Sequence, residues 1–171
     1  AYIAGVGMTP FGNAIDQSLS QLASTAINEA LKDAGIGAKD LGAAYMGNAA
    51  AGVITGQVCV PGQVVLRNMG IGRIPVINVE NACATSATAF QQAATMVTLG
   101  VYDVVLVCGY EKLYHKDKEK TFSVFTGAID VDQIDAIKAG LKTRNEAIGA
   151  ELDMSQAGIT RSIFIDIYEG M

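Results

Sequence analysis

The sequence is poor in cysteine and histidine, and the way these residues are spaced limits the kinds of site it can build. Its 171 residues include 3 cysteines and 1 histidine. Cys59, Cys83 and Cys108 each stand alone among apolar or small residues, and no C-x-x-C pair occurs. Cysteines in this arrangement form neither a disulfide framework nor the ligand spacing of a zinc site. We therefore expect free thiols and no metal site.

Basic charge and long apolar runs are also lacking. The net charge of −5 and the isoelectric point of about 4.8 give no attraction to a polyanion, which argues against nucleic acid as a partner. No stretch reaches the roughly 18 to 20 apolar residues that a membrane-spanning helix needs, so we expect no membrane span. No basic segment or signal cleavage site precedes the first apolar run, at residues 2–6. The expected compartment is the cytoplasm.

The first 110 or so residues alternate short apolar runs with helical patterns. This alternation is typical of an α/β fold, in which helices cover a mostly parallel sheet. The strands are expected at residues 2–6, 41–46, 74–79 and 101–108. The best-defined helix follows the first of them, because apolar residues recur at helical spacing over residues 19–31, between a capping box of Ser18 and Gln21 and a stop at Gly35.

Two further helices are expected between the later strands. The first covers residues 57–69, where Pro61 fits only the first turn. The second covers residues 83–99, which are small or apolar on nearly every face, so we expect a central helix buried on all sides. From residue 112 the sequence changes to alternating charges, with a last helical pattern at residues 155–171. We expect one domain over residues 1–111 and a second region over residues 112–171, in a chain that is truncated or incomplete.

The segment most informative about chemistry is residues 78–86, where an apolar strand ends, the chain turns and a helix begins next to Cys83. Unpaired N–H groups and the positive end of the helix dipole are expected to stabilise a thiolate there. The same N–H groups can hold an oxyanion. Cys83 is thus a candidate covalent nucleophile, with a buried structural cysteine as the alternative reading. Cys59 and Cys108 are expected in the core.

Three other polar residues lie near this segment or in the charged region. Glu80 and Asn81 directly precede the turn, and we expect them to tie it together through hydrogen bonds to the backbone. His115 lies in the run of alternating charges. Such a run is most often a solvated loop, so we do not expect His115 to activate Cys83.

Four motifs, at residues 5–12, 45–48, 78–83 and 102–112, resemble the thiolase superfamily in order and spacing. Within it, the chain is most similar to the branch of sterol-carrier-protein-linked and archaeal acetoacetyl-CoA thiolases. The resemblance implies a layered α/β/α fold with a mostly parallel mixed sheet and a central buried helix. This chain would be the N-terminal half of that fold, and residues 112–171 would be the loop domain.

The resemblance also implies an activity. Cys83 would take an acyl group from a 3-ketoacyl-CoA or acetyl-CoA and pass it to a second CoA or acetyl-CoA. Coenzyme A would be a substrate, with no tightly bound cofactor, and a C-terminal half would supply the activating histidine. The oxyanion site would include the N–H of Cys83, with Asn81 and Glu80 as support. The cations implied to meet the CoA phosphates are Lys112, Lys116, Lys118 and Lys120.

Two other functions remain open. One is a thiolase-like retro-aldolase that works with a small accessory subunit of zinc-ribbon and oligosaccharide-binding fold. The other is a non-catalytic subunit that binds acyl-CoA or lipid. The intact residues 79–83 favour the transferase, whereas Ser86, where many relatives have glycine, indicates a different pocket beside the thiol. The resemblance further implies a homodimer or higher homo-oligomer, with the strand at residues 74–79 close to the two-fold axis.

Overall fold

The structure, a computed structural model, describes the backbone of residues 1–169 and the side chains of residues 1–165. Contacts between residues divide the chain into two compact units, Ala1–Lys112 and Leu113–Met171. The first unit contains all the described strands, and the described residues of the second unit form helices and turns. Among the described residues, no helix combines the length and the apolar composition that a membrane span needs.

A three-stranded parallel sheet forms the centre of the first unit. The middle strand, β1 (Ala43–Gly47), pairs with β2 (Val76–Val79) on one side and β3 (Val105–Gly109) on the other. Each residue of β1 is buried, as expected for a parallel strand that is covered on both faces. β2 and β3 begin later than the apolar runs that predicted them.

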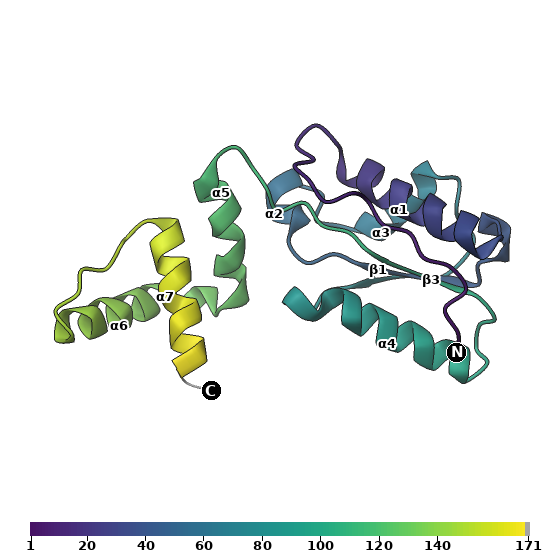
Figure 1. Ribbon diagram of the computed structural model, residues 1–171. Coiled ribbons are helices and arrows are strands. Elements are labelled where there is room, and N and C mark those ends of the chain that lie inside the picture. The colour runs from purple at the N-terminus through teal and green to yellow at the C-terminus, as the bar shows by residue number, and fades with distance from the viewer. Residues whose placement is uncertain (170–171) are drawn as a thin grey trace. The chain divides into compact units, whose positions relative to one another are not determined.

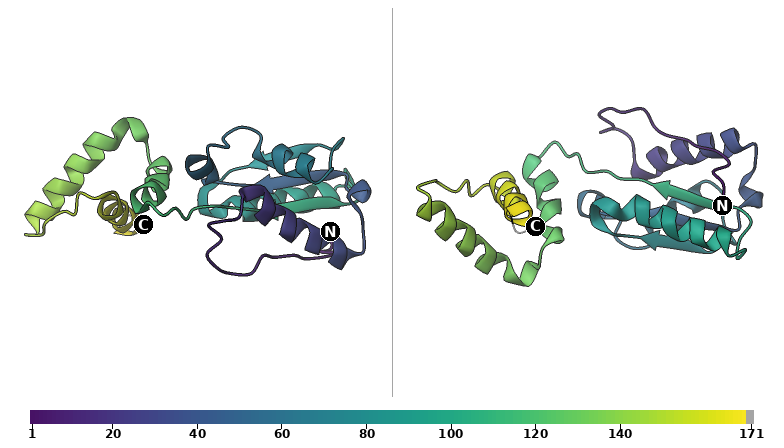
Figure 2. Two further views of the ribbon diagram at one scale, coloured as in Figure 1. Left: turned by 90° about the horizontal axis from the view of Figure 1, so that it is seen from above. Right: turned by 60° about the horizontal axis from the view of Figure 1, so that its bottom comes forward.

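Helices cover the two faces of this sheet, which gives the expected α/β/α layers. On one face lie α1 (Leu19–Ala34) and α3 (Pro61–Asn68), and on the other lies α4 (Thr85–Thr98), as Figures 1 and 2 show. Successive residues of β1 point to opposite faces. Met46 therefore packs in one core cluster with residues of α1 and α3, and Tyr45 packs in a second cluster with residues of α4.

The ends of α1 and α3 follow the predicted signals. The Ser18 hydroxyl accepts the N–H of Gln21 at 3.2 Å, while the Gln21 side chain accepts the N–H of Ser18 at 2.7 Å. Gly35 ends α1 with a left-handed φ of 66°. Pro61 is the first residue of α3, so this helix starts later than the expected residue 57. The short helix α2 (Ala51–Thr55) lies between β1 and α3.

The strand predicted at residues 2–6 is wrong, because this segment lies against α1 and not in the sheet. The N–H of Val6 donates to the Asp33 carboxylate at 2.9 Å, and the N–H of Met8 donates to the Glu29 carboxylate at 3.2 Å. Gly5 and Gly7 lie so close to α1 that a Cβ on either would collide with its backbone. Carboxylates of α1 thus bind N–H groups that a strand would donate to its neighbour.

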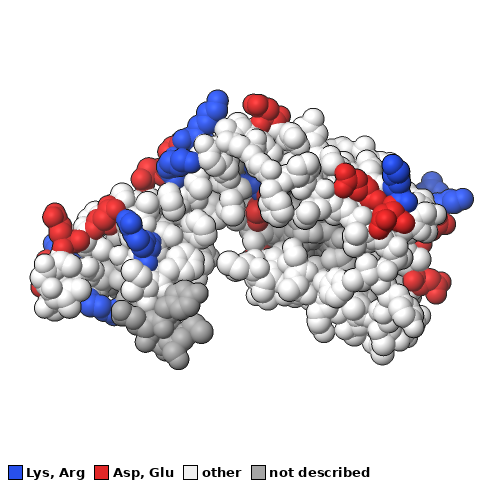
Figure 3. Space-filling view, in the orientation of Figure 1, with Lys and Arg blue, Asp and Glu red and all other residues white. Residues whose placement is uncertain are grey.

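α4 is buried on one side only, which corrects the expectation that it is covered all round. Thr85, Ala89 and Ala93 are buried, whereas Phe90 is 51% exposed. The helix carries no charged residue, and the surface over it is largely white in Figure 3. Among the described residues, no second layer covers the outer face of α4.

The described residues of the second unit form three helices, α5 (Lys118–Ser123), α6 (Ile134–Ala147) and α7 (Gln156–Glu169), with 3₁₀ turns at Val124–Ala128 and Val131–Gln133. The Phe125 ring meets Phe164 edge to face at 5.8 Å between centroids. α7 fulfils the helix expected at residues 155–171, whose last two residues lie outside the described part of the chain.

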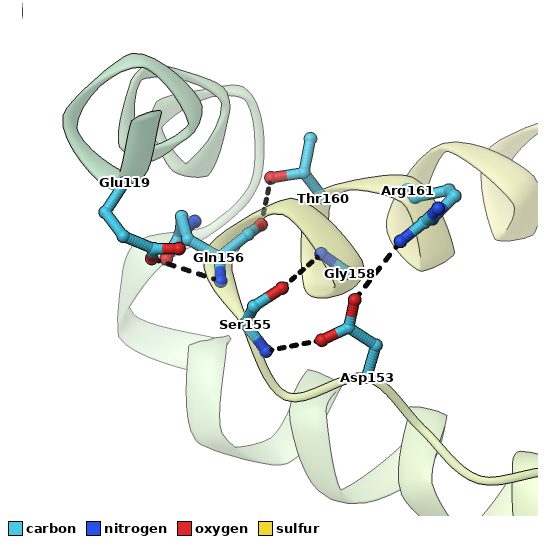
Figure 4. A network of polar contacts seen from close by, with 7 residues as sticks. All are labelled: Glu119, Asp153, Ser155, Gln156, Gly158, Thr160 and Arg161. Carbon is cyan, nitrogen blue, oxygen red and sulfur yellow. Dashed lines mark hydrogen bonds and ion pairs between the residues drawn. The ribbon is translucent and has the colours of Figure 1, made fainter. Parts of the chain in front are cut away.

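Polar contacts hold the start of α7 (Figure 4). The Asp153 carboxylate accepts the N–H of Ser155 at 2.9 Å and a guanidinium N–H of Arg161 at 3.2 Å. The Ser155 hydroxyl accepts the N–H of Gly158 at 3.1 Å, which satisfies a donor of the first helical turn. The backbone hydrogen bond from Ser155 is the main cause that lowers the pKa of Asp153.

Candidate active site

The turn between β2 and α4 places Cys83 at the carboxyl edge of the sheet. β2 ends at Val79, a 3₁₀ turn covers Ala82–Ala84, and α4 begins at Thr85. Ala82 has a φ of 45°, which is uncommon for a residue with a Cβ. Non-glycine residues persist in this conformation only where their surroundings hold them. The backbone directly before Cys83 is therefore strained.

Three side chains hold this turn. The Glu80 carboxylate accepts the N–H of Ala82 at 2.7 Å. The buried Thr85 hydroxyl accepts the N–H of Asn81 at 2.8 Å and donates to the carbonyl of Ala82 at 2.7 Å. The Asn81 amide donates to the Thr88 hydroxyl at 2.9 Å, so its side chain bonds to a side chain and not to the backbone. The hydrogen bonds that close the turn leave the N–H of Cys83 out.

Two glycines allow the first turn of α4 to lie close to the sheet. A Cβ on Gly47, at the end of β1, would come within 3.0 Å of the Thr85 methyl group. A Cβ on Gly109, at the end of β3, would collide with the hydroxyl of Ser86 and lie 3.0 Å from its Cβ. Because Gly47 and Gly109 have no side chain, Thr85 and Ser86 can lie close to the ends of β1 and β3. The two glycines thus help to set the position of the first turn of α4, next to Cys83.

The three cysteines differ sharply in exposure. Cys83 is exposed and Cys108 is buried, and burial raises the pKa of the Cys108 thiol to about 12. Cys108 is therefore the core thiol that the sequence predicts. The same prediction is wrong for Cys59, which is exposed in the loop before α3, where Val58 and Val60 are also more than half exposed.

A crevice of about 350 Å³ lies at the carboxyl ends of β1 and β2. The chain leaves β1 toward α3 on one face of the sheet and leaves β2 toward α4 on the other (Figure 1). Ligands of parallel α/β folds bind at such switch points. Its polar lining consists of Asn48, Gln57, Asn78 and Glu80, and its other lining residues are apolar or small: Met46, Ala49, Gly52, Val53, Val58, Pro61 and Val79. Cys83 itself is not among the lining residues.

The four lysines expected to meet CoA phosphates have different surroundings. The Lys112 ammonium donates to the backbone carbonyls of Ala14, Ile15 and Gln17, in the loop before α1. The Lys118 ammonium lies 4.0 Å from the centre of the Tyr114 ring. The other two lysines of the set, Lys116 and Lys120, belong with Lys118 to the second unit. A phosphate site at Lys112 would compete with the carbonyls that it already binds.

His115 is engaged locally. The Nδ1 atom of its ring accepts the backbone N–H of Asp117 at 3.1 Å, and the backbone N–H of His115 donates to the Thr121 hydroxyl at 3.0 Å. These contacts belong to the turn that leads into α5. Within the described part of the chain, no group of three or more His, Cys, Asp or Glu side chains is arranged to hold a metal ion.

The second unit has an apolar groove of about 860 Å³, and its lining among the described residues contains no cysteine, histidine or carboxylate. Arg161, at its side, is paired with Asp153. The groove is lined by Phe122, Phe125, Ala157, Thr160, Arg161, Phe164 and Ile165.

Two residues of the site were missed by sequence reasoning. Thr85 bridges the turn before Cys83, and Glu111 binds the loop after β1. The sequence does place a threonine in the first turn of the helix and an acid directly after a strand. Neither pattern reveals which backbone groups these side chains reach.

The sequence of this chain is similar to those of known proteins. Residues 1–161 match the family described as "Thiolase, N-terminal domain". The chain is 39% identical over 111 residues to an acetyl-CoA acetyltransferase of Methanocaldococcus jannaschii, which covers 65% of this chain and 28% of that protein. It is 33% identical over 162 residues to the benzoylsuccinyl-CoA thiolase subunit BbsB of Thauera aromatica, covering 93% of this chain and 39% of BbsB.

Another relative is the sterol carrier protein 2 of Gallus gallus, 33% identical over 131 residues, or 75% of this chain and 23% of that protein. Among solved structures, the Acat5 thiolase of Ascaris suum in complex with coenzyme A superposes with a TM-score of 0.57 at 14% identity, covering 85% of this chain and 48% of that one. The chain thus spans well under half the length of these curated relatives. The resemblance expected from the four motifs is confirmed, and the chain belongs to the thiolase N-terminal domain family.

Proposed function

We propose that this chain carries the nucleophile of a thiolase-type acyltransferase, with Cys83 as the residue that takes the acyl group. The observation that carries the proposal is the exposed Cys83 thiol at the carboxyl edge of the sheet, behind a turn that Glu80 and Thr85 hold in a strained conformation. Exposed thiols next to a helix N-terminus are the ones that react. Relatives named as acetyl-CoA acetyltransferase and thiolase subunit support the same class of reaction.

The reaction has two steps. The Cys83 thiolate attacks the acyl carbonyl carbon, and the carbonyl electron pair moves to oxygen, which we propose accepts the N–H of Cys83. Collapse of this intermediate breaks the bond to the CoA sulfur of acetyl-CoA, or the carbon–carbon bond of a 3-ketoacyl-CoA, whose leaving acetyl-CoA carbanion takes up a proton. A CoA thiolate or an acetyl-CoA carbanion then attacks acyl-Cys83 and releases the thiolate.

The base for these proton transfers is proposed to lie outside this chain. His115 is the single histidine of the sequence, and its Nδ1 already accepts the N–H of Asp117. The relatives are more than twice as long as the aligned part, which is compatible with a second half that completes the site.

Coenzyme A is proposed as the substrate, bound in part through Lys116, Lys118 and Lys120. The structure of the Ascaris suum Acat5 thiolase in complex with coenzyme A supports this proposal. Lys112 is the weakest member of the proposed set, because three carbonyls bind its ammonium. Neutral glutamine variants of the lysines should raise the KM for CoA.

Two partners are also proposed. β2 is an edge strand of the described sheet, and its free edge is compatible with a homodimer about that strand, which sedimentation of the full-length protein would measure. BbsB is named a subunit of its thiolase, and this supports an accessory subunit for the present protein as well.

The test is to incubate the full-length protein with acetyl-CoA or a longer 3-ketoacyl-CoA and to record its intact mass and the mass of the peptide that contains Cys83. We expect an acyl adduct on that peptide. Cys83→Ala should abolish both adduct and turnover. Cys59→Ala is the matched control, because Cys59 is also exposed but lies in the loop before α3 and not in the turn before α4, and it should leave both unchanged.

Other outcomes would replace the proposal. Unchanged thiolysis and condensation in Cys83→Ala would refute it. Release of an aldehyde or ketone without a need for free CoA would identify a lyase. Reversible binding of acyl-CoA by a protein whose Cys83 stays unmodified would identify a non-catalytic acyl-CoA-binding subunit.

A further inference from the structure

Glu111, two residues after the end of β3, binds the loop that follows β1. One carboxylate oxygen accepts the backbone N–H groups of Ala49 at 3.1 Å and Ala50 at 2.9 Å. The other accepts the side-chain amide of Asn48 at 3.3 Å and the N–H of Lys112 at 3.0 Å. A single carboxylate therefore satisfies three donors from three successive residues of a loop that lies more than sixty positions earlier in the sequence.

Asn48 links this loop to the other two strands. Its side-chain amide also donates to the carbonyl of Tyr110 at 2.6 Å, and its backbone N–H donates to the carbonyl of Val79, at the end of β2, at 3.1 Å. The loop is thus held between the carboxyl ends of β3 and β2. Its conformation depends on contacts from both sides, and Glu111 supplies most of those on the β3 side.

This loop forms one wall of the crevice at the carboxyl ends of β1 and β2. Asn48 and Ala49 line the crevice, and so do Val79 and Glu80 at the end of β2. Glu80 in turn binds the N–H of Ala82, next to Cys83. Glu111 is not among the lining residues, so it acts on the crevice only through the loop that it holds.

The lining of the crevice indicates what enters it. It includes the Glu80 carboxylate, side-chain amides and apolar residues, and neither lysine nor arginine. Phosphate groups are usually bound by arginine or lysine side chains, and a carboxylate such as that of Glu80 repels them. The crevice therefore suits the uncharged acyl part of a thioester better than the phosphate groups of CoA.

We propose that Glu111 is a positioning residue that holds the 48–50 loop as the wall of an acyl-binding crevice beside Cys83. The proposal rests on the proposed acyl transfer for the identity of the substrate, but not for the role of the carboxylate. Removal of the carboxylate leaves the N–H groups of Ala49 and Ala50 without their acceptor, so the loop opens more often and the acyl group is held less well.

The test compares Glu111→Ala and Glu111→Gln with Glu29→Gln in the full-length protein. Glu29 is the matched control, because its carboxylate also accepts a backbone N–H, that of Met8, but it lies on α1. For Glu111→Ala we expect kcat/KM to fall by about 10²-fold, the size of effect that misplacement of a reacting group produces. The loss should be mainly in KM and larger for a long acyl chain than for acetyl. Glu111→Gln, which keeps one acceptor oxygen, should recover part of it, and Glu29→Gln should match the unmodified protein.

Amide hydrogen exchange provides the readout that does not depend on catalysis. Exchange at Ala49 and Ala50 should accelerate in Glu111→Ala, while exchange in β1 and β3 stays at the rate of the unmodified protein. If Cys83 is never acylated, the proposed function fails, and exchange together with the acyl-CoA dissociation constant still decides the role of Glu111. A folded Glu111→Ala protein with unchanged exchange at Ala49 and Ala50, or with equal losses for short and long acyl chains, would overturn the inference.

Discussion

At the scale of single residues, the turn before Cys83 depends most on the Thr85 hydroxyl. Thr85→Val keeps the shape of this buried side chain but leaves the N–H of Asn81 without its acceptor. The carbonyl of Ala82 loses the hydroxyl but keeps the backbone N–H of Thr85 as a donor. Loss of one partner from buried hydrogen bonds costs about 1–3 kcal/mol. We expect the free energy of unfolding in urea to fall by about that amount, and the rate of Cys83 acylation to fall with it.

Thr85→Ser is the matched control for this change. It keeps the hydroxyl and loses the methyl group that lies against Gly47, so its turn should remain closed and its acylation rate should stay near that of the unmodified protein. If the valine and serine variants acylate equally fast, the hydroxyl does not hold the turn.

At the scale of secondary-structure elements, the glycine at the end of β3 sets how closely α4 approaches the sheet. In Gly109→Ala the new Cβ would collide with the Ser86 hydroxyl, which would have to rotate, and would lie 3.0 Å from the Ser86 Cβ. The first turn of α4, and Cys83 with it, would then shift by a few tenths of an ångström. We expect acylation of Cys83 to slow by about 10²-fold. Ser86→Gly in the same protein removes both colliding atoms and should restore most of the rate.

Gly12→Ala is the control for a general effect of adding a methyl group, since a Cβ there meets no atom within 4 Å. It should acylate normally. A double variant as slow as Gly109→Ala alone would show that the contact with Ser86 does not determine the position of Cys83.

The elements also show what the sequence could and could not predict. The ends of α1 were predictable because Ser18, Gln21 and Gly35 act on backbone groups only a few residues away. Residues 2–6 have the composition of a strand, yet a strand needs a neighbour, and the N–H groups of Val6 and Met8 bind carboxylates of α1 instead. A local sequence pattern does not show which segment a potential strand will pair with.

The same limit applies to the candidate site. Cys83 was predictable because a strand, a turn and a helix follow each other directly in the sequence around it. Glu111 was not, because the donors that it binds are more than sixty residues away. The prediction that Cys59 is buried was wrong because the apolar residues 58–60 have the composition of a buried helix start, although they lie in the loop before α3.

At the scale of the whole molecule, burial of Cys108 and Tyr110 in the core of the first unit should make its free energy of unfolding fall at alkaline pH. Burial raises the pKa of Cys108 to about 12 and is also the main cause that raises the pKa of Tyr110. Between the unfolded pKa of Cys108, 9.0, and its folded pKa, the unfolded chain has lost the thiol proton and the folded chain has kept it. Stability is therefore fully present below about pH 9 and is lost as the pH rises toward 12.

Urea unfolding of the full-length protein at a series of pH values, followed by circular dichroism, measures this loss. The free energy of unfolding should fall with a slope of up to about 1.4 kcal/mol per pH unit for each group that titrates. Cys108→Ala should be less stable at pH 7, because it leaves a small cavity, but should show a shallower slope above pH 9. Tyr110→Phe should also flatten the slope with little loss at pH 7, because the Tyr110 hydroxyl has no hydrogen-bond partner among the described residues. Slopes that are identical in both variants and in the unmodified protein would mean that neither group keeps its proton through burial in the folded core.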